Sequence, residues 1–239
     1  EKKEEFKKYW PADINIEGKD QFRGWWNSQL ILSEIAFNRK PFGSIVVHGM
    51  VLDLGKRKMS KSLGNSTSPE EIIKKYGRDY LRYYFAKISK GEYFSFDEKE
   101  FKEIEKVFTI FLNVNKFVNQ LEKGKEKKDV EDEWVLSKFY SLESEVKELY
   151  EKYLFPEIVQ KIERFVLNDL SRKYIQIIRE RSNEVYPVLN EIRIGILKLL
   201  APICPFFGEK IWQELRETGI VDEESIHLSN LSIGDKKKI

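Results

Sequence analysis

The feature that most constrains this chain is a strand–helix–strand pattern near its start. Residues 14–16 form a short β-prone run, residues 20–38 follow the period of an α-helix, and residues 44–47 form a second, apolar β-prone run. Two strands joined by one helix over this length pair in parallel. Ligands of such sheets bind beyond the carboxyl ends of the strands. The dipeptides Glu17-Gly18 and His48-Gly49 are therefore expected to share one neighbourhood.

After residue 66 the pattern becomes helical. Ser68-Pro69-Glu70-Glu71 predicts a helix start, in which Ser68 caps, Pro69 takes the first position and Glu71 closes a capping box. Further helices are predicted near 79–88, 98–121, 133–152, 156–182, 186–200 and 204–217, with a polar connection over 123–133. The fold class is thus α/β and then all-α, a partial Rossmann-type parallel sheet followed by a helical bundle.

Composition excludes several classes of function. Lysine and arginine total 42 against 40 aspartate and glutamate, so the formal net charge of +2 does not by itself indicate a nucleic-acid partner. A single cysteine, Cys204, and two histidines exclude an intramolecular disulfide and a Cys/His zinc cluster. The sequence contains neither an apolar run long enough to span a membrane nor the plan of a signal peptide. We expect a cytoplasmic protein with no bound metal and, without an initiator methionine, a fragment of a longer chain.

The stretch from His48 to Asn65 carries the clearest chemistry. Four cationic side chains fall within six positions between Gly55 and Gly64, namely Lys56, Arg57, Lys58 and Lys61. A loop of this kind can hold a polyphosphate through its ammonium groups, hydroxyls and amides. Positive charge placed where pyrophosphate leaves stabilises the transition state more than the bound ground state. Composition alone favours the alternative, an exposed basic hairpin that only aids solubility.

The order of the residues reverses that preference. Lys58-Met59-Ser60-Lys61-Ser62 resembles the KMSKS signature loop of class I aminoacyl-tRNA synthetases, and the following Leu63-Gly64-Asn65 also fits. The resemblance implies that Lys61 contacts the phosphates of ATP and that Lys58 assists. It also implies that Ser60 and Ser62 support the loop.

Residues 10–26 resemble the isoleucyl-tRNA synthetases within that class. They carry the pattern Glu-Gly-x-Asp-Gln-x-Arg-Gly-Trp followed by an aromatic residue, with Trp26 where Phe or Tyr is more familiar. Glu17 can accept hydrogen bonds from ribose hydroxyls, and Asp20 and Gln21 can orient an adenylate and the ammonium group of an amino acid. Trp25 offers a flat wall against a branched aliphatic side chain.

These residues also have structural alternatives. Packing on the sheet would explain Trp25, a helix cap would explain Asp20, and a strand end would explain His48. The resemblance places Gly18 and His48-Gly49-Met50 beside the adenylate, mainly through their backbone, and gives His48 no acid or base role.

The helical half resembles the anticodon-binding bundle of the isoleucine, leucine, valine and methionine enzymes. The matching segments are 112–117, 165–175 and 200–209, so the resemblance covers about residues 10–215. Four basic residues on or beside one long helix could meet tRNA phosphates: Arg172, Lys173, Arg179 and Arg181. The alternative is a solvent-exposed face that also carries Glu180 and Glu184, and the sequence favours neither.

The resemblance implies four segments. Residues 1–66 would be the second half of the catalytic domain with its signature loop, 67–96 a helical connection, 97–228 the anticodon-binding bundle and 229–239 a tail. The HIGH tetrapeptide of the family and an editing domain do not occur in the 239 residues. We therefore expect the chain to be inactive alone and to need an N-terminal catalytic half and an editing domain, on the same chain or on a separate subunit.

The implied reaction joins L-isoleucine to tRNA(Ile). ATP, as its Mg²⁺ complex, and isoleucine give an aminoacyl-adenylate, which then yields isoleucyl-tRNA, AMP and pyrophosphate by positioning and charge stabilisation. Two alternatives remain. The chain is a non-catalytic tRNA-binding module, or the parent protein is a valyl or leucyl enzyme.

Overall fold

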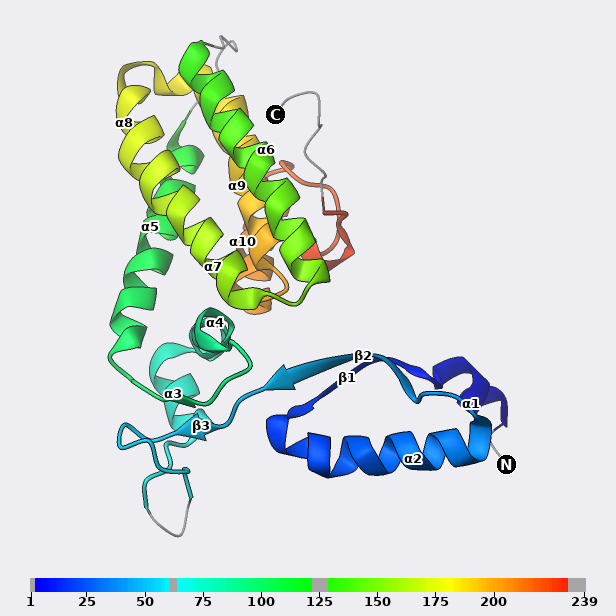
Figure 1. Cartoon of the computed structure of the whole chain (residues 1–239). Helices are drawn as coiled ribbons and strands as arrows, with labels where there is room; N and C mark the ends of the chain where they lie inside the picture. The colour runs from blue at the N-terminus through cyan, green and yellow to red at the C-terminus, as the bar shows by residue number, and fades with distance from the viewer. Residues whose placement is uncertain (1–2, 61–63, 122–128, 232–239) are drawn as a thin grey trace. The chain divides into compact units, whose positions relative to one another are not determined.

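The computed structural model describes residues 3–60, 64–121 and 129–231 (Figure 1). The chain divides into two compact units, one formed by Glu1–Ser66 with Ser89–Asp97 and the other by Thr67–Ile88 with Glu98–Ile239. The segment 67–96 that the sequence sets apart is therefore shared, because residues 67–88 pack with the bundle and residues 89–97 return to the first unit.

The first unit contains the predicted strand–helix–strand pattern. Its elements are α1 (Lys3–Tyr9), β1 (Ala12–Gly18), the short 3-10 helix η1 (Lys19–Arg23), α2 (Trp25–Phe37), β2 (Phe42–His48), β3 (Val51–Leu52) and β4 (Phe94–Ser95). Strands β1 and β2 pair in parallel, with Ala12 opposite Phe42 and Gly18 opposite His48. Strands β3 and β4 form a second parallel pair, which the sequence did not predict.

A polar relay fixes α2 against β1. The indole Nε1 of Trp26 donates to Asn15 Oδ1 at 3.0 Å, and Asn15 Nδ2 donates to Gln29 Oε1 at 3.0 Å. Trp26 is 3% exposed, so its indole N–H needs this partner once it leaves water. The helix ends at Asn38, whose left-handed conformation (φ 49°) lets its N–H bond back to the Glu34 carbonyl.

The second unit is the predicted helical bundle. Its elements are α3 (Pro69–Tyr76), α4 (Arg78–Ile88), α5 (Glu100–Gln120), α6 (Val130–Glu151), α7 (Phe155–Arg164), the π-helical segment η3 (Phe165–Tyr174), α8 (Ile175–Ile177), the 3-10 segment η4 (Arg179–Val185), α9 (Tyr186–Leu200), α10 (Pro205–Glu217) and η5 (Ile226–Leu228). In Figure 1, α6, α7 and α9 run side by side. The long helix predicted over 156–182 is thus interrupted by a π-helical and a 3-10 segment.

Helix α3 begins as predicted, with Ser68 as its cap and Pro69 as its first residue, but the partner of the cap differs. At α3 the Ser68 hydroxyl accepts from the Glu70 N–H at 3.2 Å and contacts the Glu70 carboxylate, whereas the sequence assigned that partnership to Glu71. Helix α6 begins at Val130 instead of 133 because Asp129 and Asp132 form a reciprocal capping box.

Close packing between α6 and α9 depends on one glycine. A Cβ atom added to Gly195 would lie 2.1 Å from Cζ of Phe139, which is 1% exposed. Real carbon atoms do not approach this closely, so glycine lets the Phe139 ring lie against the α9 backbone. The buried side chains of the bundle include Val135, Val146, Ile192, Ile196 and Trp212, together with the charged Glu143 and Arg193.

Polar anchors tie α4 to the turn that precedes α10. The Asp79 carboxylate accepts a hydrogen bond from the Phe207 N–H, in the first turn of α10. Arg82 Nε donates to the Ile203 carbonyl at 2.8 Å. The Asp79 carboxylate thus pairs with an N–H group that the first turn of α10 cannot pair itself, and Arg82 pairs with a carbonyl of the turn.

Candidate functional site

The carboxyl ends of β1 and β2 meet as the parallel pairing requires. Gly18 ends β1 opposite His48, the last residue of β2. A Cβ atom at Gly18 would lie 2.6 Å from Asp20 Oδ1, 3.0 Å from Met50 Cε and 3.6 Å from His48 Cε1. Gly18 is buried, and the predicted residues around it therefore form one cluster with too little room for a side chain at its centre.

The turn after β1 orders the next predicted residues. Gln21 Oε1 accepts from the Trp25 N–H at 2.9 Å and so caps α2, while Gln21 Nε2 donates to Asp20 Oδ2 at 3.0 Å. Gln21, and not Asp20, is therefore the residue that caps α2. Trp25 is 54% exposed, and the tryptophan that packs on the sheet is its neighbour Trp26. Glu17 lies opposite Val47 and is partly exposed.

The segment 89–97 completes this neighbourhood, and sequence reasoning missed it. A Cβ atom at the buried Gly49 would lie 1.8 Å from the Glu92 carbonyl oxygen, so the two backbones touch. The Glu92 carboxylate also pairs with Lys19 Nζ at 2.9 Å. The sequence contained one indication of a turn at this point, Gly91, which adopts φ 76° where the chain comes back to the first unit.

The signature loop leaves β3 and folds back on itself. Lys58 faces Leu52 in an antiparallel bridge, and the Asp53 N–H donates to the Arg57 carbonyl at 2.9 Å. Lys58 is exposed and Ser60 partly so. The predicted residues Lys61 and Ser62 lie outside the described residues.

Asp53 and Asn65 hold the base of this loop. The Arg57 N–H donates to Asp53 Oδ1 at 2.8 Å, and Asn65 Nδ2 donates to Asp53 Oδ2 at 2.9 Å. The Arg57 N–H, followed by the Asn65 amide, lowers the pKa of the Asp53 carboxyl below its usual value. Asp53 therefore favours its ionised form, and any stability that it contributes is present above its ordinary pKa and is lost as pH falls through the lowered one.

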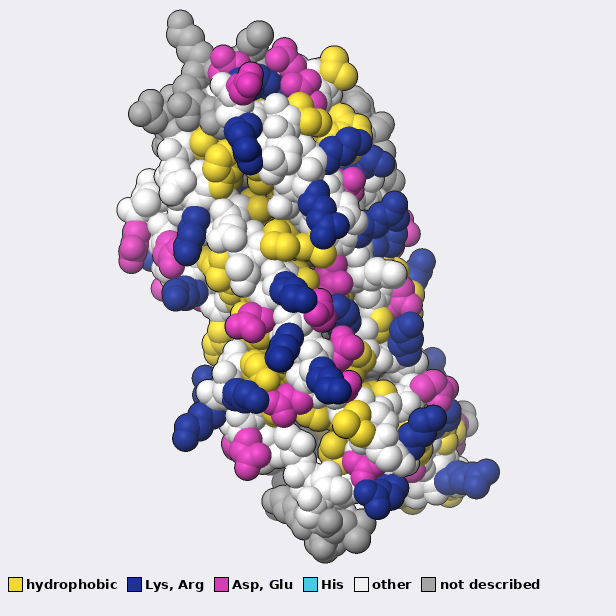
Figure 2. Space-filling model, turned by 90° about the vertical axis from the view of Figure 1, so that its left-hand side faces the viewer, with side chains coloured by type: hydrophobic (Ala, Val, Ile, Leu, Met, Phe, Trp, Pro, Cys, Tyr) yellow, Lys and Arg dark blue, Asp and Glu magenta, His cyan; other side chains and the backbone are white. Residues whose placement is uncertain are grey.

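Three of the four predicted tRNA contacts are exposed in the bundle. Arg172 Nη1 donates to Asn168 Oδ1 at 3.3 Å, Lys173 Nζ lies 4.2 Å from the ring centroid of Trp134, and Arg179 Nη2 donates to Gln176 Oε1 at 2.9 Å. All three partners are neutral, so none of them offsets the positive charge of Arg172, Lys173 or Arg179. On the face shown in Figure 2, basic side chains are interspersed with acidic ones, in keeping with the small net charge.

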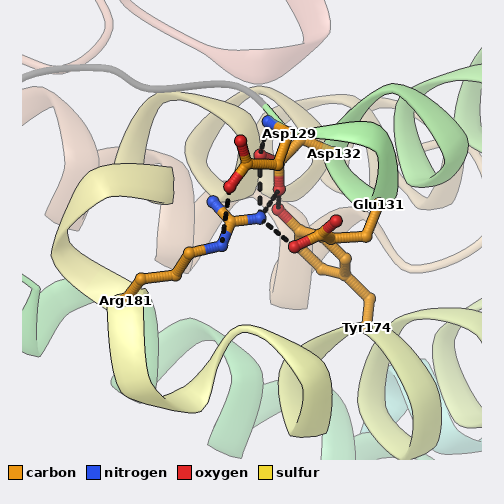
Figure 3. A network of polar contacts seen from close by, with 5 residues as sticks. All are labelled: Asp129, Glu131, Asp132, Tyr174 and Arg181. Atoms are coloured by element: carbon orange, nitrogen blue, oxygen red, sulfur yellow. Dashed lines mark hydrogen bonds and ion pairs between the residues drawn. The ribbon is translucent and has the colours of Figure 1, made fainter.

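Arg181 has a different environment (Figure 3). Its Nη2 lies 2.6 Å from Glu131 Oε1 and 3.0 Å from both oxygens of Asp132, and its Nε lies 3.6 Å from Asp129 Oδ2. Asp132 is fully buried and also accepts from the Tyr174 hydroxyl at 2.6 Å. This network gives Arg181 a structural role, so we base no tRNA contact on it.

A pocket of about 260 Å³ lies beside Arg179. Ile110, Asn113, Val114 and Phe117 of α5 line one side, and Ser171, Ile175, Gln176 and Arg179 line the other. Its walls are largely apolar with a few amide, hydroxyl and guanidinium groups, a composition suited to a flat ring with polar edges. Sequence reasoning did not identify it, because its two walls are about sixty residues apart in the chain.

Within residues 3–60, 64–121 and 129–231, no helix is long and apolar enough to cross a bilayer. In the same part of the chain, no group of three or more His, Cys, Asp or Glu side chains is placed to hold a metal ion.

Two family models match the chain. Residues 1–97 match the tRNA synthetases of class I (I, L, M and V), and residues 132–239 match the anticodon-binding domain of tRNA ligase. An isoleucine–tRNA ligase of Methanosarcina barkeri is 36% identical over 95% of this chain and 24% of its own length. The chain spans about a quarter of the length of the curated relatives it matches.

Solved structures of the same class share the fold. Methionyl-tRNA synthetase of Mycobacterium tuberculosis, bound by methionyl-adenylate, has a TM-score of 0.72 at 19% identity and covers 91% of this chain and 48% of its own. LeuRS of Agrobacterium radiobacter, in a ternary complex with tRNA and LeuAMS, also has a TM-score of 0.72 at 19% identity, covering 95% of this chain and 29% of its own. These likenesses confirm the α/β and then helical fold expected from the sequence.

Proposed function

Because the chain belongs to the class I aminoacyl-tRNA synthetases, we propose that it is part of an isoleucine–tRNA ligase. In this proposal the parent protein uses Mg²⁺-bound ATP to join L-isoleucine to tRNA(Ile) through an aminoacyl-adenylate. The first unit supplies one side of the adenylate site, and the second unit binds the tRNA. This activity belongs to protein synthesis in the cytoplasm.

One observation carries the catalytic half of the proposal. The parallel pairing of β1 and β2 sets Gly18 opposite His48, and the tight space around Gly18 brings Asp20 and Met50 to the same point. Ligands of open parallel sheets bind beyond such strand ends. The buried glycines at these strand ends let Asp20, Met50 and the Glu92 backbone pack closely, and this packing shapes the edge at which a nucleotide would bind.

Each predicted residue then has a chemical task. Glu17 accepts hydrogen bonds from the ribose, while Asp20, oriented by the Gln21 amide, faces the ammonium group of the amino acid. Trp25, exposed at the start of α2, lines the pocket for the branched side chain. Lys58 and Lys61, supported by Ser60 and Ser62, place positive charge near the phosphates as pyrophosphate leaves.

The choice of isoleucine rests on the relatives. Those matched over about 95% of this chain, at 35–36% identity, are named isoleucine–tRNA ligases. A valyl or leucyl enzyme would share the fold, so amino acid selectivity has to be measured.

The proposal predicts different activities for the chain and its parent. A full-length synthetase that contains these residues is expected to catalyse isoleucine-dependent ATP–pyrophosphate exchange, whereas the 239-residue chain alone is expected not to, because it would hold only part of the adenylate site. Exchange would be followed with labelled pyrophosphate, in parallel reactions without amino acid. Exchange by the pure 239-residue chain at the parent's rate would contradict this division of the site.

Transfer RNA binding is expected to depend on Arg172, Lys173 and Arg179. Replacing all three with glutamine in the 239-residue chain should weaken binding of tRNA(Ile). It should also reduce the slope of log affinity against log salt by about 2 to 3, since each lost phosphate contact removes somewhat less than one released counterion. Filter binding between about 50 and 200 mM salt measures both quantities.

A matched control separates specific contacts from general charge. Lys152, Lys210 and Arg216 are also exposed. Lys152 follows the end of α6, Lys210 lies in the middle of α10 and Arg216 lies in its last turn. Their triple glutamine variant carries the same loss of charge. If both triple variants lost the same affinity and the same salt slope, the face around Arg172 would not be the tRNA site.

A further inference from the structure

Asn65 joins the two ends of the signature loop through three hydrogen bonds. Its Oδ1 accepts from the Ser60 N–H at 2.9 Å, and its Nδ2 donates to the Lys58 carbonyl at 3.2 Å and to Asp53 Oδ2 at 2.9 Å. The side chain amide thus contacts the backbone at both Lys58 and Ser60. Its third bond ties that backbone to the residue that follows β3.

Asp53 is the fixed end of this arrangement. Its carboxylate accepts from the Arg57 N–H at 2.8 Å, from Arg57 Nε at 3.1 Å and from Asn65. The Asp53 side chain is 12% exposed, whereas that of Arg57 is 76% exposed. The hydrogen bond from the Arg57 N–H to the shielded carboxylate therefore stabilises the turn more than the ion pair with the exposed Arg57 side chain does, because exposed ion pairs are weak.

The neighbouring residues of the loop have little packing to hold them. Residues 54–58 are all exposed, and Lys56 adopts φ 60° in the turn between Asp53 and Arg57. Without an apolar core, the conformation of such a turn depends on its hydrogen bonds. Asp53 and Asn65 provide several of these hydrogen bonds, to backbone groups of Arg57, Lys58 and Ser60.

We propose that Asp53 and Asn65 are positioning residues, which fix the backbone at Lys58 and Ser60 and thereby place the Lys58 ammonium group against the phosphates of ATP. The inference rests on the proposed function and adds two residues to it. Neither residue touches the substrate in this account. Each acts through the backbone of the loop, where a displacement of about 1 Å can cost about 10²-fold in rate.

The test swaps the charged and the neutral side chain between positions 53 and 65 in the full-length synthetase. Asn65→Asp keeps an acceptor for the Ser60 N–H but loses the donor to Lys58 and sets a second carboxylate against Asp53. The double variant Asp53→Asn with Asn65→Asp restores a donor–acceptor pair between the two positions and keeps an acceptor for the Arg57 N–H. Glu217 is exposed at the end of α10, and Glu217→Gln is the control for the effects of mutagenesis and purification.

Two half-reactions distinguish positioning from folding. Asn65→Asp is expected to lower kcat for ATP–pyrophosphate exchange by about 10²-fold, with little change in KM for isoleucine. Transfer of isoleucine from the isolated enzyme-bound adenylate to tRNA, which needs no pyrophosphate contact, should keep its rate. The double variant is expected to recover at least tenfold of the lost exchange activity.

Other outcomes are equally informative. An equal loss in both half-reactions, or no recovery in the double variant, would assign these residues a general structural role and overturn the proposal. Unchanged exchange in Asn65→Asp would overturn it as well. Lack of isoleucine-dependent exchange in the unaltered enzyme would instead contradict the proposed function itself.

Discussion

Replacing Lys58 with glutamine in the full-length synthetase is expected to lower kcat for isoleucine-dependent ATP–pyrophosphate exchange by about 10²-fold. This is the usual cost of removing one group that stabilises developing charge. The structure places Lys58 on an exposed turn, held by its bridge to Leu52 and by the Asn65 amide. The backbone of Lys58 is therefore held in place, and glutamine keeps much of the length of the side chain while it removes the charge.

The rate should fall more than the affinity. Pyrophosphate gains charge as it leaves, so a cation beside it acts mainly in the transition state, and KM for isoleucine should change little. Lys74→Gln, exposed on α3, removes the same charge elsewhere and should leave the exchange unaltered. A reduction of less than about threefold in Lys58→Gln would remove this residue from the catalytic loop as we describe it.

Replacing Arg181 with methionine is expected to lower the free energy of unfolding of the bundle by about 3 kcal/mol. This is the typical cost of removing one partner from a buried ion pair. The Asp132 carboxylate is fully buried between Arg181 and the Tyr174 hydroxyl, and it also caps the Asp129 N–H at the start of α6. Without the guanidinium group, this negative charge would lose its cationic partner (Figure 3).

Urea denaturation followed by far-UV circular dichroism measures the change. Arg172→Met is the matched control, because Arg172 is exposed and its guanidinium donates to the neutral Asn168. It should change the free energy of unfolding by less than about 0.5 kcal/mol. Equal stability of the two variants would show that the network around Asp132 does not support the bundle.

Local sequence patterns predicted the parts of the fold that local chemistry decides. The β-prone runs and the helical stretch between them became β1, α2 and β2, and the strand ends met as parallel pairing requires. Glu17, Gly18 and His48 could thus be assigned to one neighbourhood from parallel pairing, whereas Met50 was assigned through the family resemblance. The bundle helices were predicted for the same reason, from their apolar period.

Contacts between distant segments were not predictable in this way. The return of residues 89–97 to the first unit depends on the close approach of Gly49 and the Glu92 carbonyl, which no local pattern specifies. Arg181 was expected among the tRNA contacts because its charge resembles that of Arg172 and Arg179. Its partners Asp129, Glu131 and Asp132 lie about fifty residues earlier, and only the fold brings them together.

The comparison of amino acids in ATP–pyrophosphate exchange tests the central claim most directly. A full-length synthetase that contains these residues would be assayed with isoleucine, valine and leucine under identical conditions, and kcat/KM determined for each. The account predicts that isoleucine exceeds valine by about 10²-fold, the selectivity that a hydrophobic pocket gains from one methylene group, and that it also exceeds leucine. An equal or higher kcat/KM for valine or leucine would contradict the assignment to isoleucine.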